Sequence, residues 1–64
     1  MYSIRMTQGL NKYYWDGIKW NSLAKMALLF VTERKAEIVL RNIRRFDKFS
    51  GKLVRIEVIQ VRNG

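Results

Sequence analysis

The most informative segment of this 64-residue chain is Tyr13-Tyr14-Trp15-Asp16-Gly17-Ile18-Lys19-Trp20. Asp-Gly between aromatic and aliphatic residues is the preferred centre of a two-residue type I′ β-hairpin. That turn predicts a register in which Trp15 lies opposite Ile18, Tyr14 opposite Lys19 and Tyr13 opposite Trp20. One face of the hairpin then carries Lys12, Tyr14, Lys19 and Asn21. The other is aromatic and is expected in the core; it carries Tyr13, Trp15, Ile18 and Trp20.

The residues before this hairpin alternate with a period of two. Tyr2, Ile4 and Met6 point one way, whereas Ser3, Arg5 and Thr7 point the other, which is typical of a half-buried strand. A turn over Gln8-Gly9-Leu10-Asn11 separates this strand from the hairpin, and Gly9 is free to adopt a positive φ there.

Residues 22–49 allow two interpretations. In one, a single long helix runs from Ser22 to about Phe46. In the other, which we prefer, residues 28–30 form a short buried strand, Thr32 caps a helix, and the helix covers roughly residues 33–47. Thr32 followed by Glu33 satisfies free amides at the helix start and complements the helix dipole. The apolar run over residues 26–31 also lacks the polar face that a helix on a small domain needs.

The expected helix is amphipathic. Its opposite side is basic and collects Arg34, Arg41, Arg45 and Lys48, with Arg44 at the edge. Ile38 lies on that basic side and is therefore expected to be exposed. Ser50-Gly51 ends the helix. Its core stripe follows steps of three or four residues and consists of Ala36, Val39, Leu40, Ile43 and Phe46.

The final strand is expected between Lys52 and Val61. Val54, Ile56 and Val58 share one face, and Arg55 and Glu57 occupy the other. The alternation slips at Ile59, so either a bulge lies there or both faces of the strand end are covered.

This order of elements predicts an α+β fold in one compact domain spanning residues 1–64. We expect an antiparallel sheet of three to four strands with one α-helix packed across one face, in the order β-hairpin, short strand, helix, final strand. The last strand is expected to pair with the first, which places the hairpin beyond it. The length supports no second core.

The chain resembles small phage-encoded basic proteins of ββαβ type. The resemblance covers nearly the whole chain and rests on the Tyr-Tyr-Trp-Asp-Gly-Ile-Lys-Trp hairpin, the Ala-x-x-Phe-x-Thr-x-x-x-Ala spacing of residues 27–36, and the Val/Ile-rich last strand. It implies a phage or prophage setting. The matching residues are structural, so it carries over no functional residue.

Composition argues against catalysis. The chain has no Cys and no His, which removes thiol chemistry, Cys-based metal sites and the usual general base. Its serines have no neighbouring base to activate them. We therefore expect no enzyme activity, no metal and no cofactor.

The positive charge points to an anionic partner. Thirteen Lys and Arg against five Asp and Glu give a net charge of +8, and a surplus of that size repels itself in a small fold. We predict a nucleic-acid-binding module, in which the cations hold phosphates and Tyr14, flanked by Lys12 and Lys19, stacks a base. Tyr14 packing across its strand pair is the alternative. The predicted phosphate or anion contacts are Arg34, Arg41, Arg44, Arg45, Lys48, Lys52 and Arg55.

The alternative function is a phage-encoded interaction protein that binds an acidic surface of a host protein, such as a defence or transcription enzyme, and inhibits it. The edge of the last strand offers unpaired backbone groups through which two copies could form a homodimer. We expect no membrane partner, because the longest apolar run is six residues and a bilayer span needs about 20. No signal sequence is recognised, so a cytoplasmic location, that of the host for a phage protein, is expected.

Overall fold

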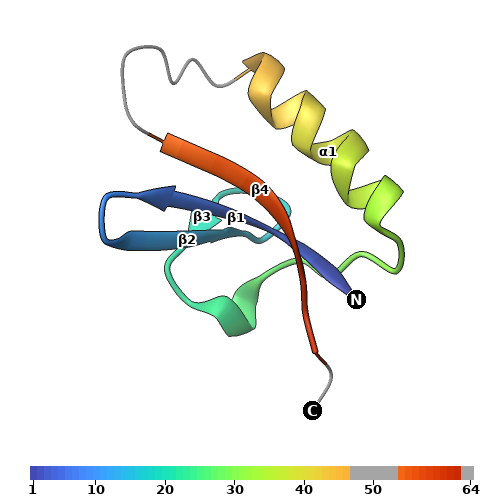
Figure 1. Cartoon of the computed structure of the whole chain (residues 1–64), viewed down its shortest axis with the longest axis horizontal. Helices are drawn as coiled ribbons and strands as arrows, with labels where there is room; N and C mark the ends of the chain where they lie inside the picture. The colour runs from blue at the N-terminus through green and yellow to red at the C-terminus, as the bar shows by residue number, and fades with distance from the viewer. Residues whose placement is uncertain (47–53, 63–64) are drawn as a thin grey trace.

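The central strand of the fold is the first one in the chain. The computed structural model describes residues 1–46 and 54–62 (Figure 1). Within them β1 (Tyr2–Gln8) pairs antiparallel with β2 (Asn11–Trp15) on one side and with β4 (Val54–Gln60) on the other. The two-residue strand β3 (Trp20–Asn21) adds to β2, so the sheet order is β3-β2-β1-β4. The predicted α+β class and the pairing of the last strand with the first are confirmed.

The turn between β1 and β2 forms where the sequence places it. Gln8 lies opposite Asn11, which leaves Gly9 and Leu10 as a two-residue connection. Gly9 has a φ of 61°, a value that glycine adopts without steric penalty. This tight turn fixes the register in which β1 faces β2.

The predicted register of the second hairpin is wrong. Trp15 lies opposite Trp20 and Tyr14 opposite Asn21, so the loop has four residues instead of two. Asp16 explains the longer loop, because its Oδ1 accepts hydrogen bonds from the backbone N–H groups of Ile18 and Lys19, each at 2.8 Å. Ile18 consequently lies in the loop with 88% of its surface exposed, not in the core as expected.

The new register brings the two tryptophans together. Their ring centroids are 5.4 Å apart at an interplanar angle of 67°, which is an edge-to-face arrangement. Such a pair stabilises a fold by about 0.5–1.5 kcal/mol beyond the area it buries. The contact between Trp15 and Trp20 therefore favours the four-residue loop over the shorter turn.

The segment before the helix is mostly irregular. Ala24–Met26 forms a single 3-10 turn, η1, so the long-helix interpretation is wrong. The expected strand over residues 28–30 is reduced to one bridge, in which Phe30 and Tyr2 exchange backbone hydrogen bonds of 2.7 and 2.8 Å. A further bond from the N–H of Leu28 to the carbonyl of Trp15 ties the segment to the end of β2.

The helix begins as predicted. It is α1 (Glu33–Phe46), and the Oγ1 of Thr32 accepts a hydrogen bond from the N–H of Lys35 at 3.2 Å. Thr32 is therefore the N-cap. The predicted end near residue 47, and the predicted breaker Gly51, lie outside the described residues.

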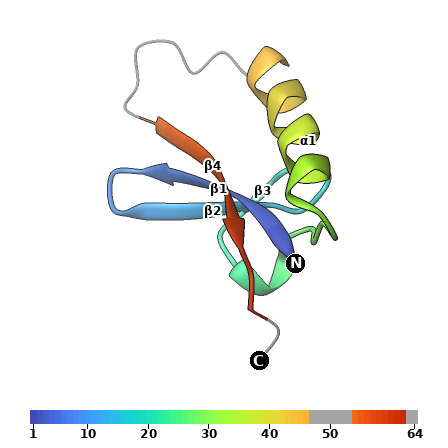
Figure 2. The ribbon, with the colours of Figure 1, turned by 45° about the vertical axis from the view of Figure 1, so that its right-hand side comes forward.

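The core lies between α1 and one face of the sheet. In Figures 1 and 2, α1 runs along one side of the sheet. The predicted exposure of Ile38 is confirmed at 52%. The stripe residues Val39 and Leu40 pack against the core, and the side chain of Phe46 lies outside the description. The buried apolar side chains are those of Ile4, Met6, Ala36, Ile43 and Ile56.

The pairing of β4 with β1 is regular from Gln8 opposite Val54 to Tyr2 opposite Gln60. The bulge considered for the end of β4 is therefore absent from this ladder. Ile59 lies opposite Ser3, whose side chain is fully buried, and Ile59 itself is half-buried. This agrees with the other expectation, that the end of the strand is covered on both faces.

Candidate nucleic-acid interface

The second face of the sheet carries the polar side chains of the central strands. Because side chains alternate along a strand, the residues between the core positions of β1 point away from α1. The strand pairing arranges them in two rows, one formed by Lys12, Thr7 and Arg55 and the other by Tyr14, Arg5 and Glu57. We call these six residues the open face.

The first row places two cations on either side of a hydroxyl. Thr7 lies directly opposite Lys12 on β2 and opposite Arg55 on β4. Directly opposite residues have Cβ atoms about 4.5–5.5 Å apart, so the small Thr7 leaves space between two longer basic side chains. Lys12 and Arg55 are both exposed.

The second row contains an ion pair. The Nη2 of Arg5 donates to the Oε1 of Glu57 at 2.7 Å, and both side chains are partly exposed. The hydrogen bond from Arg5 lowers the pKa of Glu57 below its ordinary value, assisted by the positive charges of Arg5, Arg55 and Lys12. Glu57 therefore remains ionised at neutral pH and holds the guanidinium of Arg5 in place beside Tyr14.

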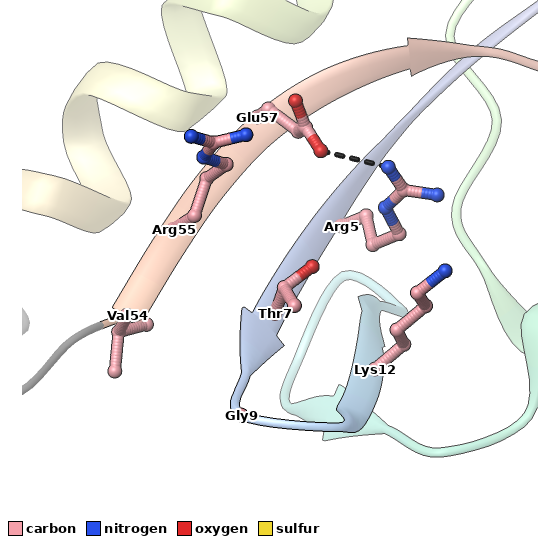
Figure 3. A pocket seen from close by; sticks show the side chains of 7 residues that line it. All are labelled: Arg5, Thr7, Gly9, Lys12, Val54, Arg55 and Glu57. Carbon is pink, nitrogen blue, oxygen red and sulfur yellow. Dashed lines mark hydrogen bonds and ion pairs between the residues drawn. The ribbon is translucent and has the colours of Figure 1, made fainter.

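A shallow hollow of about 600 Å³ lies over this face. Figure 3 shows Arg5, Thr7 and Lys12 projecting to the same side of the sheet, with the dashed line joining Arg5 to Glu57. The hollow is lined by Arg5, Thr7, Gly9, Lys12, Val54, Arg55 and Glu57. Its charged lining comes from three adjacent strands and contains three cations and one carboxylate.

The predicted helix arginines lie elsewhere. Arg34, Arg41 and Arg45 are exposed on the side of α1 that faces away from the sheet. A second shallow hollow there is lined by Arg34 and Arg41 together with Ile38, Glu33 and Glu37. Two carboxylates therefore share the surface with the arginines, which weakens its positive potential.

Arg44 has a structural partner. Its Nη2 donates to the backbone carbonyl of Ile56 at 2.8 Å. Within the described sheet β4 is the edge strand, and this bond gives the carbonyl of Ile56 a partner outside the sheet. Arg44 therefore links the end of α1 to the sheet edge.

The structure does not bring the predicted basic residues into one surface. Arg55 lies on the open face, on the opposite side of the sheet from α1, and so does not extend the helix arginines. Lys48 and Lys52 lie outside the described residues. Lys19 is in the four-residue loop and not opposite Tyr14 as predicted; Arg5 and Asn21 take the positions opposite Tyr14.

Sequence reasoning missed Arg5 and Thr7 as members of a basic surface. Their alternation with Ile4 and Met6 already indicated the face away from the core. Their neighbours, however, depend on the registers with β2 and β4, which no single-strand pattern supplies. Knowledge of both pairings would have identified the two rows.

Several apolar residues that are near one another in the sequence are also exposed. Between β3 and α1 the exposed large hydrophobic side chains are Leu23, Met26, Leu28, Leu29 and Val31, and they range from 40% to 68% exposure. The Cδ2 of Leu28 would lie 3.5 Å from a Cβ built at Gly17, so this segment lies beside the loop that exposes Ile18. We call residues 23–31 the apolar segment.

The carboxylate of Asp16 is stabilised by its own loop. Hydrogen bonds from the backbone of Lys19 and Ile18 lower the pKa of Asp16 below its ordinary value.

The described residues show neither a metal-binding cluster nor a membrane-spanning helix. Across residues 1–46 and 54–62, no three acidic side chains lie close enough together to hold a metal ion. No helix of the described chain has the length and apolar composition to cross a membrane.

Comparison with protein-family models, with curated proteins and with solved structures found no match to this chain.

Proposed function

We propose that this protein is a non-enzymatic module that binds nucleic acid. The supporting observation is the amount of exposed, unneutralised positive charge. The chain has thirteen Lys and Arg residues, and the structure describes all of them except Lys48 and Lys52. Ten of these eleven described residues are exposed. Within the described residues, one ion pair, Arg5–Glu57, has nitrogen and oxygen within bonding distance.

Phosphate is the anion that this arrangement suits. Arginine donates in pairs from a planar group and matches phosphate oxygens. Each phosphate contact releases counterions, so affinity falls with salt, and contacts to the backbone give little sequence selectivity. The sequence predicts phosphate contacts from Arg34, Arg41, Arg44, Arg45 and Lys48, extended by Lys52 and Arg55. Of these, Arg55 lies with Lys12 on the open face, so the described cations offer two surfaces, the open face and the outer side of α1.

A non-enzymatic role agrees with the surroundings of two acids. The carboxylate of Asp16 accepts hydrogen bonds from its own loop, and that of Glu57 accepts one from Arg5, so both have structural roles. A phage accessory or regulatory protein in the host cytoplasm remains the setting that we predict from the sequence resemblance.

The proposal is tested by fluorescence anisotropy with labelled single-stranded and duplex oligonucleotides over a series of salt concentrations. We expect binding at low salt and a linear fall of log affinity with log salt. Poly-glutamate is the control polyanion, because it carries comparable charge without phosphates or bases. Absence of binding to both DNA and RNA at low salt would refute the proposal.

A second candidate function is suggested by the apolar segment. Contiguous exposed apolar surface is typical of protein–protein contacts, and Lys25 adds a cation within it. This favours a host protein with an apolar, acid-rimmed surface as partner, in keeping with the inhibitor alternative. Pull-down from nuclease-treated lysate, with Leu28→Ser as the variant, separates this function from nucleic-acid binding. A stoichiometric partner lost in the variant supports it, and an unchanged pull-down contradicts it.

Self-association through β4 remains a prediction. β4 is an edge strand, but Arg44 occupies the carbonyl of Ile56 along that edge. A dimer through this edge requires Arg44 to leave, so Arg44→Ala should favour the dimer in sedimentation equilibrium. A monomer for both proteins at high concentration would contradict it.

A further inference from the structure

We infer that the open face is a binding site for single-stranded nucleic acid, in which Lys12 and Arg55 hold phosphates and Tyr14 stacks a base. This inference rests on the proposed function and adds to it the face used and the class of nucleic acid. Three features of the described residues carry it: the position of the cations, the position of Tyr14, and the state of Arg5.

The cations are arranged for a phosphate chain. Lys12, Thr7 and Arg55 form a row across three strands, and the Thr7 hydroxyl between the two cations can donate to a phosphate oxygen. The open face contains one carboxylate, that of Glu57, which is bonded to Arg5. Glu33 and Glu37, in contrast, share the helix hollow with Arg34 and Arg41. The open face therefore complements phosphate better.

Tyr14 lies beside this row but outside the core. Tyr13 and Trp15, its neighbours on β2, pack against the buried core cluster, and Tyr14 is absent from that packing. It is half-buried on the open face, two residues along β2 from Lys12. That separation is about 6.6 Å along a strand, so a base stacked on Tyr14 leaves its phosphate within reach of Lys12.

Arg5 completes the surface. It lies opposite Tyr14, and the bond to Glu57 fixes the orientation of its guanidinium. Bases stack on arginine planes as well as on aromatic rings. A guanidinium already held in place loses less conformational freedom when a base is added.

This chemistry selects single strands over duplexes. In a duplex the base faces are stacked on one another, so Tyr14 and Arg5 gain nothing, and phosphate contacts alone remain. A single strand presents both phosphates and unpaired bases to one surface. The occupant that fits the open face is therefore single-stranded DNA or RNA.

The experiment measures anisotropy of a labelled oligothymidylate of about twelve nucleotides and of its duplex with oligoadenylate. The sheet variant is Lys12→Gln with Arg55→Gln. The matched control is Lys25→Gln with Arg62→Gln, which removes one exposed lysine and one exposed arginine that lie outside the open face and outside the outer side of α1. A third protein, Arg34→Gln with Arg41→Gln, tests the helix.

We expect tighter binding to the single strand than to the duplex. The sheet variant should lower the slope of log affinity against log salt by about 1.4, since each phosphate contact on a single strand contributes about 0.7. The Lys25/Arg62 control should retain more of the affinity for the single strand than the sheet variant does. Tyr14→Leu should weaken single-strand binding about fivefold or more and leave duplex binding unchanged. Circular dichroism checks that each variant folds. If Tyr14→Leu does not fold, the salt dependence of the sheet variant tests whether the open face binds the single strand.

The results distinguish the two proposals. If the unaltered protein binds no nucleic acid, the proposed function fails, and the inference with it. If it binds, but affinity falls in the helix variant and not in the sheet variant, nucleic-acid binding stands and the open face is refuted. Equal affinity for duplex and single strand, together with no effect of Tyr14→Leu, also overturns the inference.

Discussion

The orientation of α1 decides which sheet face is open, and two isoleucines of this helix test it. Ile43 is 6% exposed and packs in the core, whereas Ile38, five residues earlier on the same helix, is 52% exposed. The same substitution, Ile to Ala, at both positions removes the same atoms from the two sides of one helix. Replacing Ile43 should destabilise the protein severely, and replacing Ile38 should not.

The magnitude follows from the burial. Ile43→Ala removes three buried carbon groups at about 0.8 kcal/mol each, or about 2.4 kcal/mol, and the remaining cavity raises the range to about 2–5 kcal/mol. Ile38→Ala loses about half of the transfer term and regains about 0.4 kcal/mol through the higher helix propensity of alanine. Its destabilisation should stay below about 1 kcal/mol. A domain of this size has a total stability of about 3–10 kcal/mol.

Urea unfolding followed by tryptophan fluorescence measures both variants, because Trp15 and Trp20 pack against the core. We expect the midpoint to fall for Ile43→Ala at an unchanged slope of free energy against urea. Equal losses for the two variants, or a larger loss for Ile38→Ala, would refute the placement of the helix and with it the open face.

Three further predictions follow from local geometry. Thr32→Ala removes the helix N-cap and should lower stability by about 1 kcal/mol in urea unfolding, whereas Thr32→Ser should be close to neutral; a loss in both would contradict a capping role. Gly17→Ala forces a side chain onto a φ of 104° and should destabilise by about 1–3 kcal/mol, and a neutral effect would argue against this loop. Folding lowers the pKa of Asp16 and Glu57 from 3.8 and 4.5, so their stabilisation is present above those values and is lost as pH falls through the lowered folded values. The combined variant Asp16→Asn with Glu57→Gln, followed by thermal unfolding between about pH 2 and 7, should flatten this acid decline; an unaltered decline would show that other groups cause it.

Local sequence signals predicted the elements that depend on local physics. Thr32 and the periodicity after it specified α1 because capping and amphipathicity act within one segment. The turn at Gly9 was likewise predicted from the sequence, because glycine adopts a positive φ without steric penalty. The alternation of β1 and the apolar face of β4 were sufficient for the strands. No local pattern specifies the pairing of the last strand with the first; it was an expectation without such a signal, and the structure confirms it.

The errors occurred where two local preferences compete. Asp16-Gly17 favours a two-residue turn, but the Asp16 carboxylate also binds two backbone N–H groups of a longer loop, and that loop pairs Trp15 with Trp20. The sequence contains both options and does not show which has the lower free energy. Ile18 was misplaced for this reason.

The candidate site was the least predictable feature. Counting charge along the chain emphasised the helix and the residues after it, since those cations are adjacent in sequence. The open face unites Lys12, Arg5 and Arg55 from three strands, and more than 40 residues separate Lys12 from Arg55. Only the registers of the sheet bring them together, and registers arise from tertiary pairing.

The most direct test of the open face is chemical-shift mapping by NMR. A 15N-labelled sample of the full chain is titrated with unlabelled oligothymidylate at low salt, and amide shifts are followed residue by residue. We predict the largest changes at Thr7, Lys12, Tyr14 and Arg55, with small changes along the outer side of α1. Changes confined to residues 34–45, or to the apolar segment, would contradict the account.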